Sequence, residues 1–249
     1  RRWAAAANRL RAAFNQVFWL DDRGWYALGL DRDKRPIDAL ASNIGHLLWT
    51  GIADEDRAAR VAELMVSPEL FSGWGIRTLA TGMGRYDPVS YHNGSVWPHD
   101  TAICAAGLMR YGHVDAAHRV IEGLLDTADA MGGRLPELFA GFDRRHLGVP
   151  ADYPTSCSPQ AWAAAAPLLL VRAMLRLEPD APCGTVRIAP ALPPGVERLA
   201  IRGVEIGGRR TEIEAAGASV QASGLEGLTL VAEPTALPGP GGRRGAPAR

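Results

Sequence analysis

The chain lacks the marks of a nucleic-acid-binding, secreted or membrane protein. Its 27 Lys and Arg residues balance 27 Asp and Glu residues, so no net field attracts nucleic acid or an anionic membrane. Its three cysteines, Cys104, Cys157 and Cys183, form no CxxC pair and no even disulfide framework, which favours a reducing, cytoplasmic compartment. The most apolar stretch, residues 161–175, is too short to span a bilayer.

Hydrophobic spacing predicts a mainly helical protein. Apolar residues recur at intervals of three and four, with turn and cap residues between the runs. Asp54 is expected to cap the third helix, and Ser158-Pro159 to supply the cap and first turn of the last one. The predicted helices cover 3–18, 42–50, 54–66, 98–110, 114–131 and 158–177.

The character of the sequence changes after residue 179. Short alternating runs at 186–188, 199–201 and 228–231 are separated by Gly and Pro, which predicts a small β-rich appendage over 184–233. Residues 234–249 are mostly Pro, Gly, Ala and Arg, a composition that favours disorder. The predicted organisation is therefore a helical domain (1–179), the appendage and a tail.

Long polar loops inside a compact helical domain usually carry function, and three stand out here. The first places Trp74 between two glycines, three residues before Arg77. An indole can stack on the face of a sugar ring, and a guanidinium supplies donors for hydroxyl groups. Taken alone, this loop fits a core tryptophan with a structural arginine slightly better.

The second loop, residues 86–100, leads into a helix and is dense in donors, acceptors and aromatic faces, as a polyhydroxylated ligand requires. Structural alternatives remain open, because an acid or a histidine in the first helical turn also complements the helix dipole. Two histidines separated by six residues without a third ligand make a poor zinc signature, so no metal is expected. The candidate binding residues are Tyr91, His92, Asn93, Trp97, His99 and Asp100.

The third loop carries Glu137 among apolar neighbours, and Gln160 and Trp162 follow downstream. A carboxylate in apolar surroundings must be paired or be functionally perturbed. A salt bridge to Arg134 or Arg77 is the structural alternative for Glu137.

Together these segments resemble a known family. SNIGHLLWTGI, FSGWGIRTLA, YHNGSVWPHDTA, LPELFAGF and YPTSCSPQAWAAA, in this order, resemble bacterial amylo-alpha-1,6-glucosidases. That family groups with trehalases, processing alpha-glucosidases and mannosylglycerate hydrolase-like enzymes among the six-hairpin glycosidases. The resemblance implies an (α/α)6 toroid that hydrolyses an alpha-glucosidic bond with inversion, without a cofactor. It also implies Glu137 as general base and sugar-binding roles for Trp74, Arg77, Tyr91, His92, Asn93, Trp97, Gln160 and Trp162.

The general acid that the resemblance implies has no match in this chain. Asp21-Asp22 follows a helix end and is typical of a turn. About six helices are predicted where a full ring needs twelve, and the sequence does not begin with Met. We therefore expect the C-terminal half of a toroid, inactive without a missing N-terminal half.

Two other functions stay open. A sugar epimerase or isomerase on the same toroid would use His92 with His99 or His146 for proton transfer. A non-catalytic carbohydrate-binding module would use the same aromatic residues without Glu137. Glycogen branch points, short alpha-glucosides, trehalose-like sugars and glycosylated glycerate all fit as the oligo- or polysaccharide partner, and neither nucleic acid nor membrane is expected.

Overall fold

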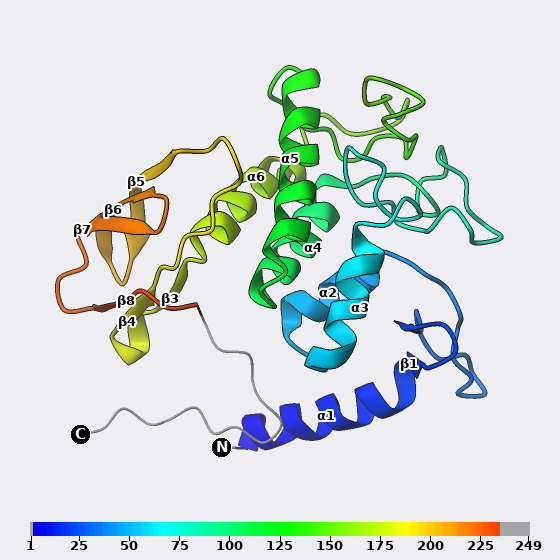
Figure 1. Ribbon diagram of the computed structural model, residues 1–249, viewed down its shortest axis with the longest axis horizontal. Helices are drawn as coiled ribbons and strands as arrows, with labels where there is room; N and C mark the ends of the chain where they lie inside the picture. Colours follow the sequence, from blue (N-terminus) through cyan, green and yellow to red (C-terminus); the bar gives the residue numbers. More distant parts are fainter. Residues whose placement is uncertain (1, 235–249) are drawn as a thin grey trace.

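A computed structural model describes residues 2–234 (Figure 1), and Pro234 alone of the predicted tail lies within that range. The helices are α1 (Arg2–Phe18), α2 (Asn43–Thr50), α3 (Glu55–Met65), α4 (Pro98–Arg110), α5 (Val114–Ala130) and α6 (Ala161–Leu175). The strands are β1 (Trp19–Leu20), β2 (Trp25–Tyr26), β3 (Glu178–Asp180), β4 (Thr185–Arg187), β5 (Arg198–Ile206), β6 (Arg209–Ala216), β7 (Ser219–Ser223) and β8 (Thr229–Val231).

The prediction for the start of the last helix was wrong. Ser158 and Pro159 precede α6, and the extended residue Gln160 is its N-cap, with a side-chain oxygen 2.8 Å from the Ala161 amide. Asp54 stands at the N-cap of α3, but its carboxylate contacts Arg11 at 3.5 Å and makes no cap hydrogen bond. The other helix ends agree with the prediction to within one or two residues.

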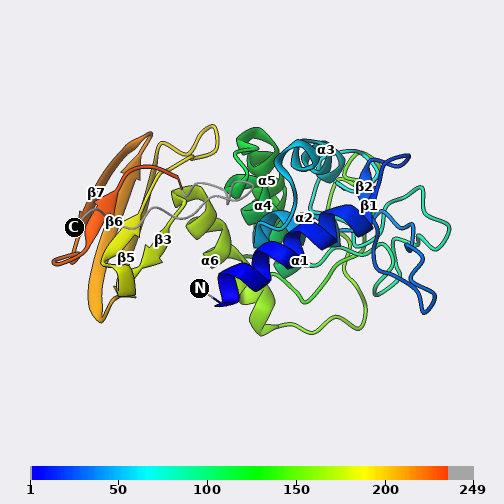
Figure 2. The ribbon, with the colours of Figure 1, turned by 90° about the horizontal axis from the view of Figure 1, so that it is seen from below.

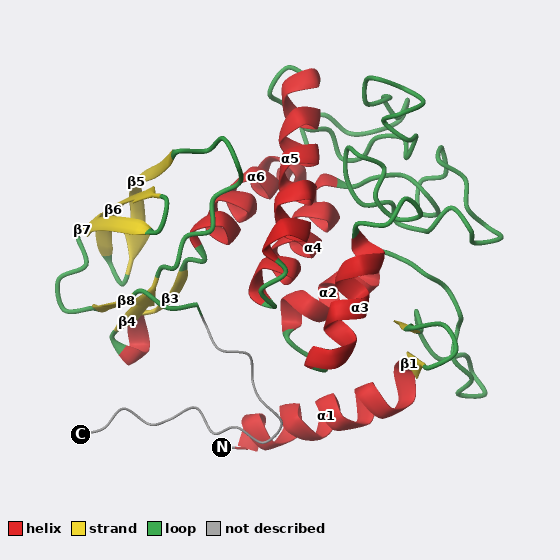
Figure 3. Ribbon diagram, in the orientation of Figure 1, coloured by secondary structure: helices red, strands yellow, loops and turns green. Residues whose placement is uncertain are grey.

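Three helices, α2, α4 and α6, form the centre of the helical part, with α4 packed between the other two. Glycine allows α2 and α4 to approach closely, because a Cβ on Gly107 would lie 2.7 Å from the Gly45 carbonyl oxygen. Helix α5 packs on another face of α4, while α1 lies along one edge of the array (Figures 1 and 2). The described helices form an open array and do not close into a ring (Figure 3).

The strands after α6 form two three-stranded sheets. One has the order β3-β4-β8 with β4 and β8 parallel, and the other is the antiparallel meander β5-β6-β7. β6 and β7 were not predicted, since charged residues alternate along RRTEIEAA and polar ones along SVQAS. A separate hydrophobic cluster lies beneath these sheets and consists of Leu175, Leu177, Val186, Ile188, Ile206, Ile213 and Ala215. No helix in the described range is both long and apolar enough to cross a membrane.

One polar residue anchors α1 to the rest of the helical part. Asn15 is the only buried residue of α1, and its side-chain amide donates to the Ile52 carbonyl at 2.8 Å. Its side-chain oxygen accepts from the Tyr26 hydroxyl and from the Asp54 amide at 3.1 Å. Burial raises the pKa of Tyr26 to about 12, so this hydroxyl remains a donor at neutral pH.

We predict that Asn15→Ala lowers the free energy of unfolding by about 1–3 kcal/mol, because it leaves buried donors and acceptors without partners. Asn8→Ala removes the same side chain from an exposed position of the same helix and serves as the control. Urea unfolding of both variants checks the prediction, and equal stabilities would contradict it.

Candidate functional site

The three loops noted in the sequence gather on one side of the helices, where α4 and α6 begin (Figure 1). Isolated β-bridges join them in the order Arg77–Val96, Val96–Phe139 and Phe139–Asp152. The Val96 and Phe139 backbones exchange hydrogen bonds of 2.9 and 3.0 Å. Trp97 follows Val96 directly and Glu137 lies two residues before Phe139, so this short ladder brings the candidate segments together.

Glu137 is 7% exposed and has no arginine or lysine partner among the described salt bridges. Its backbone amide donates to the Cys157 carbonyl at 2.9 Å. Its carboxylate accepts from the Gln160 amide at 3.4 Å and from the Cys157 amide at 3.5 Å, both long hydrogen bonds. Burial, together with the neighbouring Glu137 carboxylate, raises the pKa of the Tyr91 hydroxyl. The carboxylate is therefore held in place without being neutralised by a cation.

The rings of Tyr91, Trp97, His99 and Trp162 form an aromatic wall beside Glu137. The imidazole of His99 stacks on the Trp162 indole with centroids 4.3 Å apart and planes 8° from parallel. Trp97 meets Tyr91 edge-on at 4.9 Å and Trp162 at 5.8 Å, and its indole N–H donates to the Tyr91 carbonyl. Trp162 is 45% exposed, so this wall presents a flat face to solvent.

The remaining candidates of the second loop differ in exposure. His92 is exposed and its ring lies 4.8 Å from that of Tyr91. Asn93 is half-buried, and its carbonyl accepts from the Asp87 amide. Both lie beside the aromatic wall, and of the two only His92 is exposed.

Asp100 forms a pair that the sequence analysis did not predict. Its Oδ1 lies 2.5 Å from Nε2 of His46 in α2, whereas its buried Oδ2 has no hydrogen-bond partner. The signal in the sequence was a lone histidine in the apolar run NIGHLLW. Burial lowers the pKa of the neighbouring His99, whose Nδ1 is also buried without a partner, so His99 is neutral at pH 7. Two adjacent polar groups at the start of α4 thus have unused hydrogen-bonding capacity.

His46, Asp100 and Cys104 are the one group of described residues with a composition and spacing compatible with a metal ion. The direct contact between His46 and Asp100 leaves no space for an ion between those two atoms. Burial also raises the pKa of the Cys104 thiol well above its usual value, which disfavours the thiolate that a metal requires. We assign no metal to this group.

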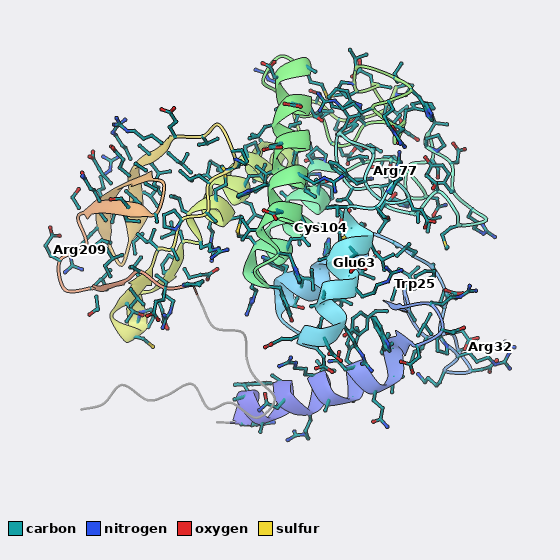
Figure 4. The ribbon with its side chains drawn as sticks, viewed as in Figure 1. Trp25, Arg32, Glu63, Arg77, Cys104 and Arg209 are labelled. Carbon is teal, nitrogen blue, oxygen red and sulfur yellow. The ribbon has the colours of Figure 1, made fainter. Side chains whose placement is uncertain are left out.

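The two candidate side chains of the first loop, Trp74 and Arg77, are buried inside the protein. The Arg77 side chain is 2% exposed, and it donates to the carbonyls of Gly141 at 2.7 Å and Pro68 at 2.9 Å (Figure 4). Trp74 is 4% exposed and lies beneath the Arg144 guanidinium, 4.1 Å from its ring centroid. The Arg77 guanidinium is committed to backbone carbonyls, and Trp74 is buried beneath Arg144 with its indole N–H unpartnered, so we leave both out of the proposed binding surface.

The fold of this chain is similar to those of several solved structures. The Thermus thermophilus mannosylglycerate hydrolase in complex with glucose aligns at 20% identity over 62% of this chain and 36% of its own, with a TM-score of 0.48. A protein described as a sialidase aligns at 13% identity over 91% and 22%, with a TM-score of 0.72. Neutral trehalase Nth1 from Saccharomyces cerevisiae aligns at 16% over 70% and 30%, with a TM-score of 0.53. The chain thus spans between 22% and 36% of each of these structures, and identities this low concern the fold alone.

The helical fold is related to that of the six-hairpin glycosidases. A family model for the mannosylglycerate hydrolase MGH1-like glycoside hydrolase domain matches residues 1–143, more than half of the chain, so the chain belongs to that family. No curated protein sequence matches it. The resemblance to six-hairpin glycosidases is confirmed, whereas the amylo-alpha-1,6-glucosidase assignment stays a prediction.

The loop ladder depends on a contact that only glycine permits, and this yields a prediction. A Cβ on Gly141 would lie 1.8 Å from the Gly94 carbonyl oxygen, so Gly141→Ala must push the two loops apart. We expect a loss of about 1–3 kcal/mol or more in the free energy of unfolding. Gly148→Ala is the matched control, because nothing lies within 4 Å of its Cβ position. Thermal unfolding of both variants measures the difference, and an unchanged Gly141→Ala protein would refute the contact.

Asp143 yields a pH-dependent prediction. Bidentate hydrogen bonds of 2.9 Å from Arg145, with Arg77 3.7 Å away, hold the pKa of Asp143 well below its usual range. A depressed carboxyl pKa stabilises the fold above the unfolded-state value of about 3.9 and loses that effect as the pH falls.

We therefore expect Asp143→Asn to lower stability at pH 7 and the difference from the parent to shrink below about pH 4. Urea unfolding between about pH 2.5 and about pH 7, a range that brackets the unfolded-state value, measures the difference. Asp129→Asn, at an exposed position of α5, should show no such pH-dependent difference. A difference for Asp143→Asn that does not shrink as the pH falls would exclude the charge as its origin.

Proposed function

We propose that this chain carries the general base of an inverting glycoside hydrolase that cleaves an alpha-glucosidic bond of an oligo- or polysaccharide, as in amylo-alpha-1,6-glucosidases. The observation behind the proposal is the Glu137 carboxylate, which is buried, unpaired with any described cation and bordered by an aromatic wall. In this mechanism Glu137 accepts a proton from a water molecule as that water attacks the anomeric carbon. Gln160 and the Cys157 amide keep the carboxylate oriented toward that water.

The aromatic wall suits the sugar itself. The exposed face of Trp162 is available to stack on a pyranose ring, and Tyr91 and His92 offer a hydroxyl and a ring nitrogen beside it. We assign substrate-binding roles to Tyr91, His92, Asn93, Trp97, His99, Asp100, Gln160 and Trp162.

The general acid of this mechanism lies elsewhere. Inversion places the two carboxyl groups roughly 6.5–9.5 Å apart with a water between them. Asp100 is engaged by His46, so it is a poor acid for this role. We therefore propose that residues 1–179 form the C-terminal half of an (α/α)6 toroid, with residues 184–233 as an appended domain. A further N-terminal part would then supply the acid and cover the exposed apolar face of α6, where Leu168 is 72% exposed.

A non-catalytic carbohydrate-binding module is the second candidate. It is favoured by the open stacking face of Trp162 and by a site in which the described residues provide one available carboxylate. The histidine-pair isomerase has less support, because the His99 ring is stacked flat on Trp162.

We expect Glu137→Gln to reduce glucose release from alpha-glucosides by about 10²–10⁴-fold, the usual contribution of a general base. The assay uses the chain extended by its upstream coding sequence and a panel of alpha-glucosides, trehalose and glucosylglycerate. Glu122→Gln removes an exposed carboxylate from α5 and should leave the rate unchanged.

The outcomes of this assay separate the candidates. Equal turnover by parent and Glu137→Gln would remove Glu137 from the mechanism. Sugar binding that Trp162→Ala abolishes, with no turnover on any substrate, would instead establish the binding module.

A further inference from the structure

A second cavity lies at the other end of the central helices. It has a volume of about 400 Å³ and lies where α2, α4 and α6 end. Met109, Leu169 and Ala173 form its apolar lining, and the Trp49 indole, 45% exposed, provides a flat wall. Its size is within the range of small-molecule sites.

The charge of this cavity is positive. Arg110, Arg172 and Arg176 line it, and the one acidic residue of the lining, Glu178, is paired with Arg172 at 3.1 Å. Arg110 and Arg176 have no carboxylate partner among the described salt bridges. Two guanidinium groups therefore lack counter-charges in one concave surface.

Helix ends explain part of this arrangement. Arg110 donates to the Trp49 carbonyl in the last turn of α2 at 2.8 Å, a carbonyl that the helix leaves free. Arg172 donates at 3.0 Å to the carbonyl of Leu177, two residues past the end of α6. Arg176 does not follow this pattern. It ends α6 in the left-handed conformation, with φ of 46°, and its buried Nε has no hydrogen-bond partner. Burial lowers the pKa of its guanidinium, a sign of a cation without compensation.

We propose that this cavity binds a small organic phosphate, a compound with a ring and a phosphate group such as a sugar phosphate or a nucleotide. The phosphate lies between Arg110 and Arg176, since guanidinium groups bind phosphate oxygens through paired, charge-assisted hydrogen bonds. The ring lies against Trp49 and the apolar lining. A purely apolar ligand would leave the Arg176 Nε unsatisfied, which argues for the anionic class.

The cavity is separate from the site around Glu137. Helix α4 connects them, beginning beside Trp97 and ending at Arg110, and its 13 residues span about 20 Å. A small ligand bound here does not touch a single sugar ring at Trp162, so the two sites bind their ligands independently.

Calorimetric titration of the 249-residue chain with AMP, glucose 6-phosphate, glucose and inorganic phosphate tests this proposal. We expect at least one of AMP and glucose 6-phosphate to bind, more tightly than glucose or inorganic phosphate, with an affinity that falls as salt is raised. Arg176→Gln should weaken that binding at least tenfold, and Trp49→Ala should remove the preference for the ring compound over inorganic phosphate. Arg85→Gln removes an equal charge from an exposed loop position and should have no effect.

Arg176→Gln is suited to this test because its side chain holds no other described group in place, and thermal unfolding of the variant verifies that it remains folded. Absence of binding by AMP and glucose 6-phosphate would overturn the proposal. Equal affinities for the parent, Arg176→Gln and Arg85→Gln would do so as well, because binding would then lie elsewhere. Either result leaves the role of Glu137 untouched, since that role is tested by turnover.

Discussion

The buried guanidinium of Arg77 is the interaction on which the loop side of the molecule depends. It is 2% exposed and joins segments that are far apart in the sequence, through the Pro68 and Gly141 carbonyls and the Asp143 carboxylate. Placing a cation in the interior is costly unless several partners compensate it, so these partners must be present together. Because Gly141 follows Glu137 by four residues, the same guanidinium fixes the path of the loop that carries the proposed base.

Arg77 and the aromatic residues therefore have different roles, because Arg77 holds the loops in place while aromatic side chains remain exposed. The described backbone ladder between the loops consists of isolated single bridges, so side chains must also hold the loops together. Arg77 holds the loops on their buried side. Trp97 holds the second loop beneath the aromatic wall, because its indole N–H donates to the Tyr91 carbonyl. The faces of Trp162 and His92 remain available to a ligand because other residues hold the loops.

Helix positions could be predicted from the sequence because their signals are local. The apolar period of residues 114–131 and the proline that opens residues 98–110 each fix an element without distant information. The start of α6 was misplaced because Ser-Pro has the chemistry of a helix start, whereas the actual cap is the side chain of Gln160. β6 was missed because its charged residues face solvent on a two-residue period, and only its pairing with β5 defines it as a strand.

The clustering of some candidate site residues could also be predicted from the sequence. The clustering of Tyr91, Trp97 and Glu137 was inferred from a resemblance between ordered motifs, and the structure brings these residues together. Neither the Gly141 partner of Arg77 nor the His46 partner of Asp100 could be deduced locally, because each contact crosses more than 50 residues of chain. An arginine beside a glycine-tryptophan loop has the same local sequence whether it faces a sugar or a backbone carbonyl.

The two ends of the central helices favour side chains of opposite charge, because α4 and α6 run in the same direction with respect to the loops. α4 and α6 both begin at the loop side, where free amides and the partial positive charge of the helix dipoles favour a carboxylate such as Glu137 or Asp100. Their opposite ends present free carbonyls and a partial negative charge, which favour arginines. Arg110 donates to the Trp49 carbonyl at the end of α2 and Arg172 to the Leu177 carbonyl just past α6, whereas the buried Nε of Arg176 has no hydrogen-bond partner. That surplus of positive charge, next to an exposed indole, is what distinguishes a ligand cavity from ordinary helix capping at this end of the array.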